Sequence, residues 1–170
     1  MLNLLFLFVR LAFFKATPDQ VPVGRSTLTI AVLMMLTANV VVTFTWYGFA
    51  GALFLALVEV LLNGLFLYGC LAVRQHRSRF EQSLTAICGI SAVMALVAWP
   101  WALAVGAAEN GELPQWIMWG QMILMMWSLL IWSRILRLAC GFNQLTAAAL
   151  SLSFFFLSAV VIASVAPTAL

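Results

Sequence analysis

The chain has 170 residues, of which 65% are hydrophobic and only 8% are charged. A soluble domain carries about 25% charged residues, so this chain lacks the polar groups needed to cover a surface in water. Its apolar runs are continuous rather than alternating, which favours helices over barrel strands. The fold class that we predict is all-α: a polytopic membrane bundle of five transmembrane helices plus an N-terminal interfacial helix.

Residues 1–26 are predicted to form an interfacial amphipathic segment and its linker. The opening run, MLNLLFLFVRLAFFKA, is too short to cross a hydrocarbon core about 30 Å thick. Its Arg10 and Lys15 would reach lipid head groups. A signal peptide is the alternative interpretation, but no basic region precedes the run and no small-residue cleavage site follows it.

Residues 27–166 hold five apolar runs, which we predict to be a five-helix transmembrane domain, and residues 167–170 form a short outward tail. A bilayer core needs roughly 20 apolar residues per helix. A very short turn near Trp46–Gly48 joins the first two runs, which would form an antiparallel hairpin. The predicted spans are residues 27–46, 47–73, 83–106, 115–135 and 145–166.

The charges give the orientation of this arrangement. All eight Lys and Arg residues fall on one side of it, whereas the loop at 107–114 carries Glu109 and Glu112. The positive-inside rule then places the N-terminus in the cytoplasm. We expect an integral protein of a bacterial-type inner membrane, with its C-terminus in the periplasm.

Glu59 is the one ionisable side chain within the second predicted span, about 18 Å from the start of that span. Asn63 lies one helical turn further on the same face, Asn39 lies on the first span, and Gln121 lies on the fourth. These four residues are the candidate intramembrane polar site. The functional interpretation is a pocket for a ligand, lipid or ion, or a proton-accepting site.

The structural interpretation is that a neutral Glu59 joins neighbouring helices by hydrogen bonds, and a contact between subunits is a third alternative. A charge at the bilayer midplane costs about 2.5–3.5 kcal/mol on insertion scales. We therefore expect Glu59 to face the bundle interior. Asn39, Asn63 or a polar group of the third or fourth span should lie within hydrogen-bonding reach of it.

Basic residues at the cytoplasmic surface form a second set of candidates. The stretch RQHRSRFEQ at 74–82 is the most charged of the chain. It either determines topology or binds anionic lipid head groups on the cytoplasmic face. Nucleic acid is not expected as a partner, because the patch is short and lies against the membrane. The head-group and topology candidates are Arg74, His76, Arg77, Arg79, Arg134 and Arg137.

Two helix faces are suited to close packing. Gly48, Ala52 and Ala56 recur at four-residue spacing, which lets a second helix of this chain, or one of another protomer, approach closely. The fourth span, WIMWGQMILMMWSLLIW, is rich in Met and Trp. It would pack against lipid or the core, or serve as a docking face for a partner.

The sequence holds no phosphate loop, no HExxH or GxSxG motif, and no Ser-Lys or Asp-Asp pair at one depth. Its three cysteines lie toward the reducing cytoplasmic side, and we predict neither a metal site nor a cofactor. We therefore expect a non-enzymatic accessory, scaffold or assembly subunit of a membrane complex, acting as a homo- or hetero-oligomer with other membrane proteins. The alternative is a small transporter or channel subunit built around Glu59 and Asn63.

Five spans, a cytoplasmic N-terminus, a very short first hairpin and a short outward tail resemble the Yip1-like family of small membrane proteins. Residues 133–161, SRILRLACGFNQLTAAALSLSFFFLSAVV, resemble the basic turn and the small-residue-rich final helix of that family. The resemblance covers about residues 25–166 in topology. The longer cytoplasmic domain and the acidic Tyr-Gly motif of eukaryotic members are missing. The resemblance implies a membrane adaptor with partners and no established catalytic residues.

Overall fold

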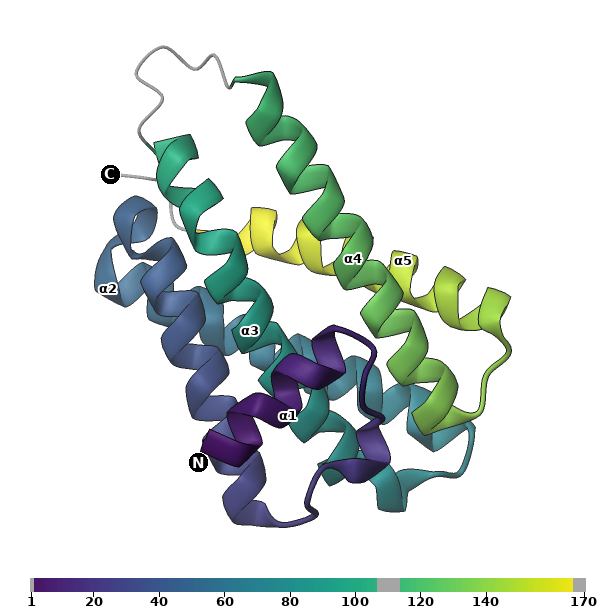
Figure 1. Ribbon diagram of the computed structural model, residues 1–170. Helices are drawn as coiled ribbons and strands as arrows, with labels where there is room; N and C mark the ends of the chain where they lie inside the picture. Colours follow the sequence, from purple (N-terminus) through teal and green to yellow (C-terminus); the bar gives the residue numbers. More distant parts are fainter. Residues whose placement is uncertain (1, 107–113, 167–170) are drawn as a thin grey trace.

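The computed structural model describes residues 2–106 and 114–166, and every regular element within these ranges is a helix (Figure 1). Four of the helices are long and apolar enough to cross a membrane. The predicted acidic pair Glu109 and Glu112 and the tail at 167–170 lie outside the described residues. The elements are α1 (Leu2–Ala12), η1 (Pro18–Gln20), α2 (Arg25–Val73), η2 (Arg77–Arg79), α3 (Phe80–Gly106), α4 (Gln115–Cys140) and α5 (Gln144–Val165).

Helix α2 consists of two helices that meet at Gly48. This residue has φ 62° and ψ 180°, a backbone conformation that is open to glycine and strained for other residues. Side chains pair across the two halves, Asn39 with Glu59 and Asn63 with Met35. In each pair, the two residues lie equally many positions before and after the residue that follows Gly48. The two halves therefore run antiparallel, and the predicted hairpin is present in the structure.

The main core lies where α1 to α4 meet, and α2 shares its most extensive contact with α3. Ala52 and Ala56, two of the small residues that recur at four-residue spacing, are buried inside this chain. This agrees with the interpretation in which they pack against a helix of the same chain. Helix α5 passes behind α4 and crosses it (Figure 1). The largest fully buried side chains include Phe8, Met35, Leu67, Leu71, Ile87 and Leu136.

The N-terminal helix α1 packs across α3 (Figure 1). Its Phe8 is fully buried, and a Cβ atom added at Gly89 of α3 would lie 2.4 Å from the Phe8 ring. Only glycine therefore allows the ring to sit at this depth on α3. The linker after α1 is held to α3 as well: Gln82 of α3 donates hydrogen bonds to the carbonyl oxygens of Asp19 and Val21 in this linker, at 2.8 and 2.9 Å.

Two side chains of α4 bind the end of α1. The indole N–H of Trp127 donates to the carbonyl oxygen of Ala12 at 3.0 Å, and the Nη1 atom of Arg134 donates to the carbonyl oxygen of Phe14 at 2.8 Å. The last turn of a helix leaves its carbonyl oxygens without partners inside the helix, and such groups are costly away from water. These bonds therefore fix α1 as an integral part of the bundle.

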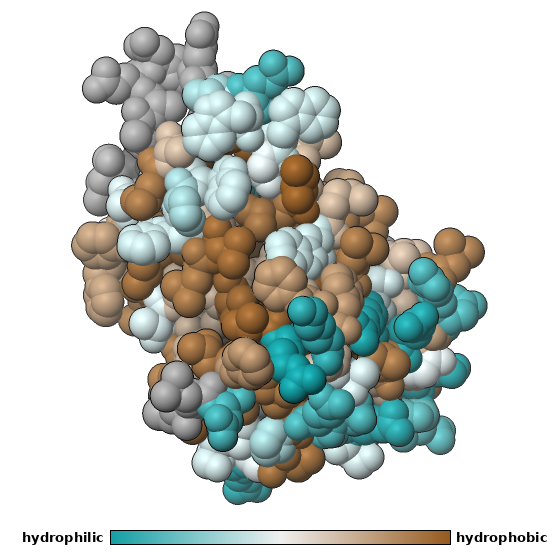
Figure 2. Space-filling model, in the orientation of Figure 1, coloured by the Kyte–Doolittle hydropathy of each residue, from teal (hydrophilic) through white to brown (hydrophobic). Residues whose placement is uncertain are grey.

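Hydrophilic residues gather at one end of the molecule, over the α2–α3 and α4–α5 connections, and a broad hydrophobic surface covers much of the rest of this face (Figure 2). Helix α5 begins at this polar end, where the side chain of Asn143 accepts a hydrogen bond from the backbone N–H of Thr146 at 2.7 Å. This N-cap satisfies one of the first N–H groups of α5.

Candidate binding site within the helix bundle

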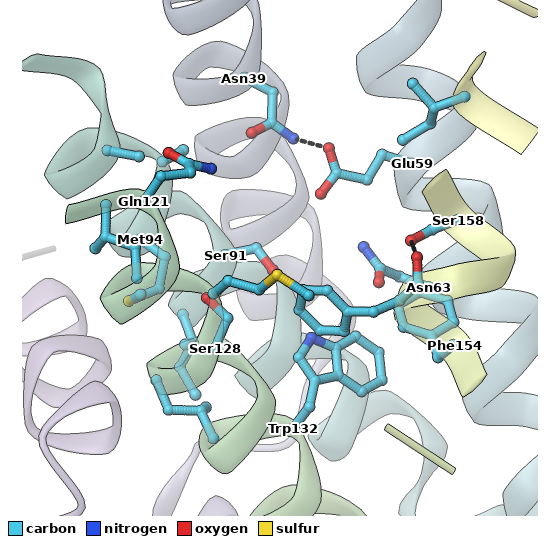
Figure 3. Close-up of a pocket in the computed structure, with 18 residues that line it drawn as sticks. Asn39, Glu59, Asn63, Ser91, Met94, Gln121, Ser128, Trp132, Phe154 and Ser158 are labelled. Atoms are coloured by element: carbon cyan, nitrogen blue, oxygen red, sulfur yellow. Dashed lines mark hydrogen bonds between the residues drawn. The ribbon is translucent and has the colours of Figure 1, made fainter. Parts of the chain in front are cut away.

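A cavity of about 250 Å³ lies among α2, α3, α4 and α5, and 18 residues line it (Figure 3). All four of the predicted intramembrane polar residues are in its wall. Asn39 comes from the first half of α2, Glu59 and Asn63 come from the second half, and Gln121 comes from α4. The fold thus brings together in one site four residues that are spread over nearly half of the sequence.

Glu59 and Asn39 face each other across the α2 hairpin. The Nδ2 atom of Asn39 donates a hydrogen bond to the Oε2 atom of Glu59 at 2.7 Å, so that Asn39 is the one of the expected partners that pairs with Glu59. The second carboxyl oxygen of Glu59 points toward the cavity, and it makes no hydrogen bond within the described part of the chain (Figure 3). One oxygen thus links the two halves of α2, and the other is open to the cavity.

Asn63 lies next to Glu59 and is only 3% exposed. Its Nδ2 atom lies 3.9 Å from the sulfur of Met35, which is a weak acceptor. Its amide oxygen accepts no hydrogen bond from any residue that the structure describes. Buried amide groups in proteins normally have such partners. An open acceptor on a cavity wall is therefore a place for a donor from water or from a ligand.

Three serines that were not predicted as site residues complete the polar wall: Ser91 of α3, Ser128 of α4 and Ser158 of α5. Ser158 donates to the carbonyl oxygen of Phe155 at 3.0 Å. The hydroxyls of Ser91 and Ser128 have no hydrogen-bond partner in residues 2–106 and 114–166. Serine is common in membrane helices, so its presence alone gave no signal. The signal that the sequence did offer was the seven-residue spacing from Gln121 to Ser128, which places both residues on one helical face.

Aromatic side chains form another part of the cavity wall. The ring centroids of Trp132 and Phe154 lie 4.5 Å apart, with an interplanar angle of 31°. The Phe66 ring lies 4.7 Å from Phe154 and supports it from the side of α2. Figure 3 shows Trp132 and Phe154 below Asn63, while Glu59 lies above it. The cavity therefore has a carboxyl and amide wall that adjoins an aromatic wall.

Two arginines of the predicted basic loop bind the end of α4. Arg74 donates from Nε to the carbonyl oxygen of Cys140 and from Nη2 to that of Gly141, both at 3.1 Å. Arg79 donates from Nη1 to the carbonyl oxygen of Leu138 at 3.3 Å. The C-terminus of a helix carries free carbonyl groups and a partial negative charge, which cations stabilise. These two side chains thus have a structural role that the sequence did not indicate.

The other basic candidates lie apart from the cavity. The guanidinium of Arg77 lies 5.6 Å from the centre of the Tyr68 ring. His76 contacts the carbonyl oxygen of Arg74 through Nδ1, Arg134 binds the end of α1, and Arg137 is exposed. Within residues 2–106 and 114–166, no three His, Cys, Asp or Glu side chains are grouped as a metal ion would require. The three cysteines are buried free thiols.

Comparisons with known proteins gave no match: no family model matches the chain, and neither a curated protein nor a solved structure matches it. The Yip1-like resemblance therefore stays a prediction from topology. What the fold and the cavity define is a class, an all-helical membrane protein with a polar cavity inside its bundle. The chemistry of that cavity is the basis for a functional proposal.

Proposed function

We propose that this protein binds a small polar or charged ligand within the bilayer, as a small transporter or channel subunit. The convergence of polar side chains from α2, α3, α4 and α5 on one cavity carries this proposal. Polar groups at membrane depth are costly, and those that do not pair with one another mark ligand and ion pathways. Among the described residues, only one oxygen of Glu59 has a partner, and the amide oxygen of Asn63 has none. These open polar atoms support the transporter alternative as our first proposal, with the scaffold as the second.

The proposal includes five spans, because the two halves of α2 each have the length of a bilayer crossing. Arg74, Arg79 and Arg134 lie near the ends of the spans that the positive-inside rule assigns to the cytoplasm. The N-terminus is then cytoplasmic, α1 is an interfacial helix on that side, and the C-terminus is periplasmic in a bacterial-type inner membrane. We propose no catalytic role for any residue of the chain.

A scaffold or Yip1-like adaptor is the second candidate function, and one observation favours it. Trp119, Met122, Ile123 and Met126 of α4 form an outward face on which each side chain is more than half exposed. In a membrane, such a face contacts either lipid or another protein, and flexible Met side chains suit variable partners. A stable complex with another membrane protein, detected by native mass spectrometry, would support this function.

Cysteine accessibility tests the primary proposal. In a variant with alanine at the three native cysteine positions, Ser128→Cys places a thiol on the cavity wall and Leu130→Cys places one on the lipid-facing side of the same helix. A thiol reacts as thiolate, which needs a polar surrounding. A hydrophilic methanethiosulfonate reagent should modify residue 128 and spare residue 130. Equal resistance of both thiols would show a dry cavity and overturn the proposal.

A further inference from the structure

The geometry points to a class of ligand for this cavity. We infer that the site binds a small protonated amine, with its ammonium group beside Glu59 and Asn63 and its hydrocarbon part against Trp132 and Phe154. This inference rests on the proposed function, since it names the ligand class of the same cavity. Three independent features of the wall support it: its charge, its free hydrogen-bonding atoms and its aromatic rings.

The charge of the wall favours a cation. Glu59 is the one ionisable residue among the 18 lining residues. None of the Lys, Arg or His side chains lines the cavity, so an anion would lose its hydration without gaining a counter-charge. A cation would gain the carboxylate of Glu59 as its partner, and opposite charges attract one another more strongly beside a protein interior of low dielectric constant than in bulk water.

The free polar atoms are mostly acceptors. The Nδ2 atom of Asn39 is used by Glu59, and that of Asn63 is turned toward the sulfur of Met35. The second oxygen of Glu59, the amide oxygens of Asn39 and Asn63, the Gln121 amide and two serine hydroxyls thus stay open in the described part of the molecule, so that open acceptor atoms outnumber open donor atoms. A protonated amine carries N–H donors and no acceptor, which matches this set. Quaternary ammonium ions lack these donors and match it less well.

The aromatic wall and the volume define the rest of the ligand. Trp132 and Phe154 pack on one another at 4.5 Å beside Asn63, so that they offer an apolar contact to the hydrocarbon part of a ligand held there (Figure 3). Sites for drug-sized ligands have about 300–1,000 Å³. The volume of about 250 Å³ is below that range and well above the space that a bare metal ion fills. A small aliphatic amine fits both limits.

Calorimetric titration of the full-length protein in lipid nanodiscs tests this inference, with empty nanodiscs subtracted. The probes are butylammonium, tetramethylammonium, sodium ion and 1-butanol, the last having the chain of butylammonium without its charge. Butylammonium should bind saturably, and butanol and tetramethylammonium should bind more weakly by about tenfold or more. Equal binding of butanol, or preferred binding of sodium, would overturn the amine as ligand.

Variants locate the binding. Glu59→Gln should weaken butylammonium binding by about tenfold or more, because the amide retains a partner for Asn39 but carries no charge. Ser153→Ala, on the exposed side of α5, is the matched control and should leave binding unchanged. Unchanged binding in Glu59→Gln would overturn the inference. If Ser91→Ala is used as a second variant, a weaker affinity with normal thermal stability supports it.

The thiol at residue 128 separates this inference from the proposed function. Butylammonium should protect that thiol from the hydrophilic reagent. A reactive thiol that butylammonium does not protect would overturn the amine as ligand and leave the polar site intact. A thiol that does not react under any condition would overturn the site itself.

Discussion

The amide of Asn39 donates a 2.7 Å hydrogen bond to the carboxyl group of Glu59 across the α2 hairpin, so one residue both links the hairpin and lines the cavity. Replacing Glu59 with leucine leaves the amide unpaired inside the bundle. We expect Glu59→Leu to lower the free energy of unfolding by about 1–2 kcal/mol. Glu59→Gln keeps an acceptor for Asn39 and should cost less than about 0.5 kcal/mol.

The stability of both variants is measured by thermal unfolding in detergent, with size-exclusion chromatography to monitor the fraction of protein that stays folded. In the double variant with Asn39→Leu, the loss should be smaller than the two single losses combined, since both partners of the bond are then removed. Equal losses for Glu59→Gln and Glu59→Leu would show that the hydrogen bond has no part in stability.

The contact between Phe8 and Gly89 predicts a strong effect of a single methyl group. A Cβ atom at Gly89 would lie 2.4 Å from the Phe8 ring, so Gly89→Ala should force α1 away from α3 and destabilise the protein by about 1–3 kcal/mol. Gly64→Ala is the matched control, because a Cβ atom there has no neighbour within 4 Å. It should be neutral or slightly stabilising by about 1 kcal/mol at most.

Chemical or thermal unfolding of the purified protein distinguishes these two alanine variants. Phe8→Ala should remove most of the additional cost of Gly89→Ala, since the clash is with the ring. If Gly89→Ala is as harmless as Gly64→Ala, α1 does not pack on α3 in the way that the structure places it.

The bonds from Arg74 to the end of α4 predict a difference between neighbouring arginines. Arg74→Gln removes two hydrogen bonds to the Cys140 and Gly141 carbonyl oxygens and should cost about 1–2 kcal/mol. Arg77→Gln removes the same charge from the same loop but only a contact with Tyr68, and should cost about 0.5 kcal/mol or less. Melting temperatures of the two variants measure this, and equal shifts would mean that charge alone matters.

The five-span topology that we propose predicts which thiols a membrane-impermeant reagent reaches. In a variant without native cysteines, Ser78→Cys and Gln144→Cys should be labelled only after the cytoplasmic side is exposed. Gln115→Cys, at the start of α4, should be labelled from the outside of intact cells or spheroplasts. All three positions are exposed in the structure. Labelling of residue 115 from the cytoplasmic side alone is incompatible with this topology.

Much of the fold follows from hydropathy. The apolar runs located the long helices, and the short turn near Gly48 was predicted, although its left-handed φ of 62° was not. Helix α4 continues to Cys140, beyond residue 135, where we predicted the fourth span to end. Arg134 and Arg137 end the apolar run there. The capping bonds from Arg74 and Arg79 satisfy the carbonyl groups of the additional turn.

The site was predictable only in part, and the reason is physical. A carboxylate among apolar residues is conspicuous because its burial is costly, and a second polar residue one turn away on the same face strengthens the signal. Burying a serine such as Ser91 or Ser128 costs little free energy, so these residues are not conspicuous in the sequence. Their convergence with Glu59 depends on how α3 and α4 pack against α2, which no local pattern determines.

The claim that the cavity is a ligand site is tested most directly by a crystal structure grown from lipid with 3-iodopropylammonium, whose iodine gives an anomalous signal. We expect one strong peak inside the bundle, against Trp132 and Phe154, with density for the ammonium group between Glu59 and Asn63. That peak should be absent in Glu59→Gln at the same amine concentration. Peaks confined to the lipid-facing surface, with only protein side chains or ordered lipid in the cavity, would contradict the claim.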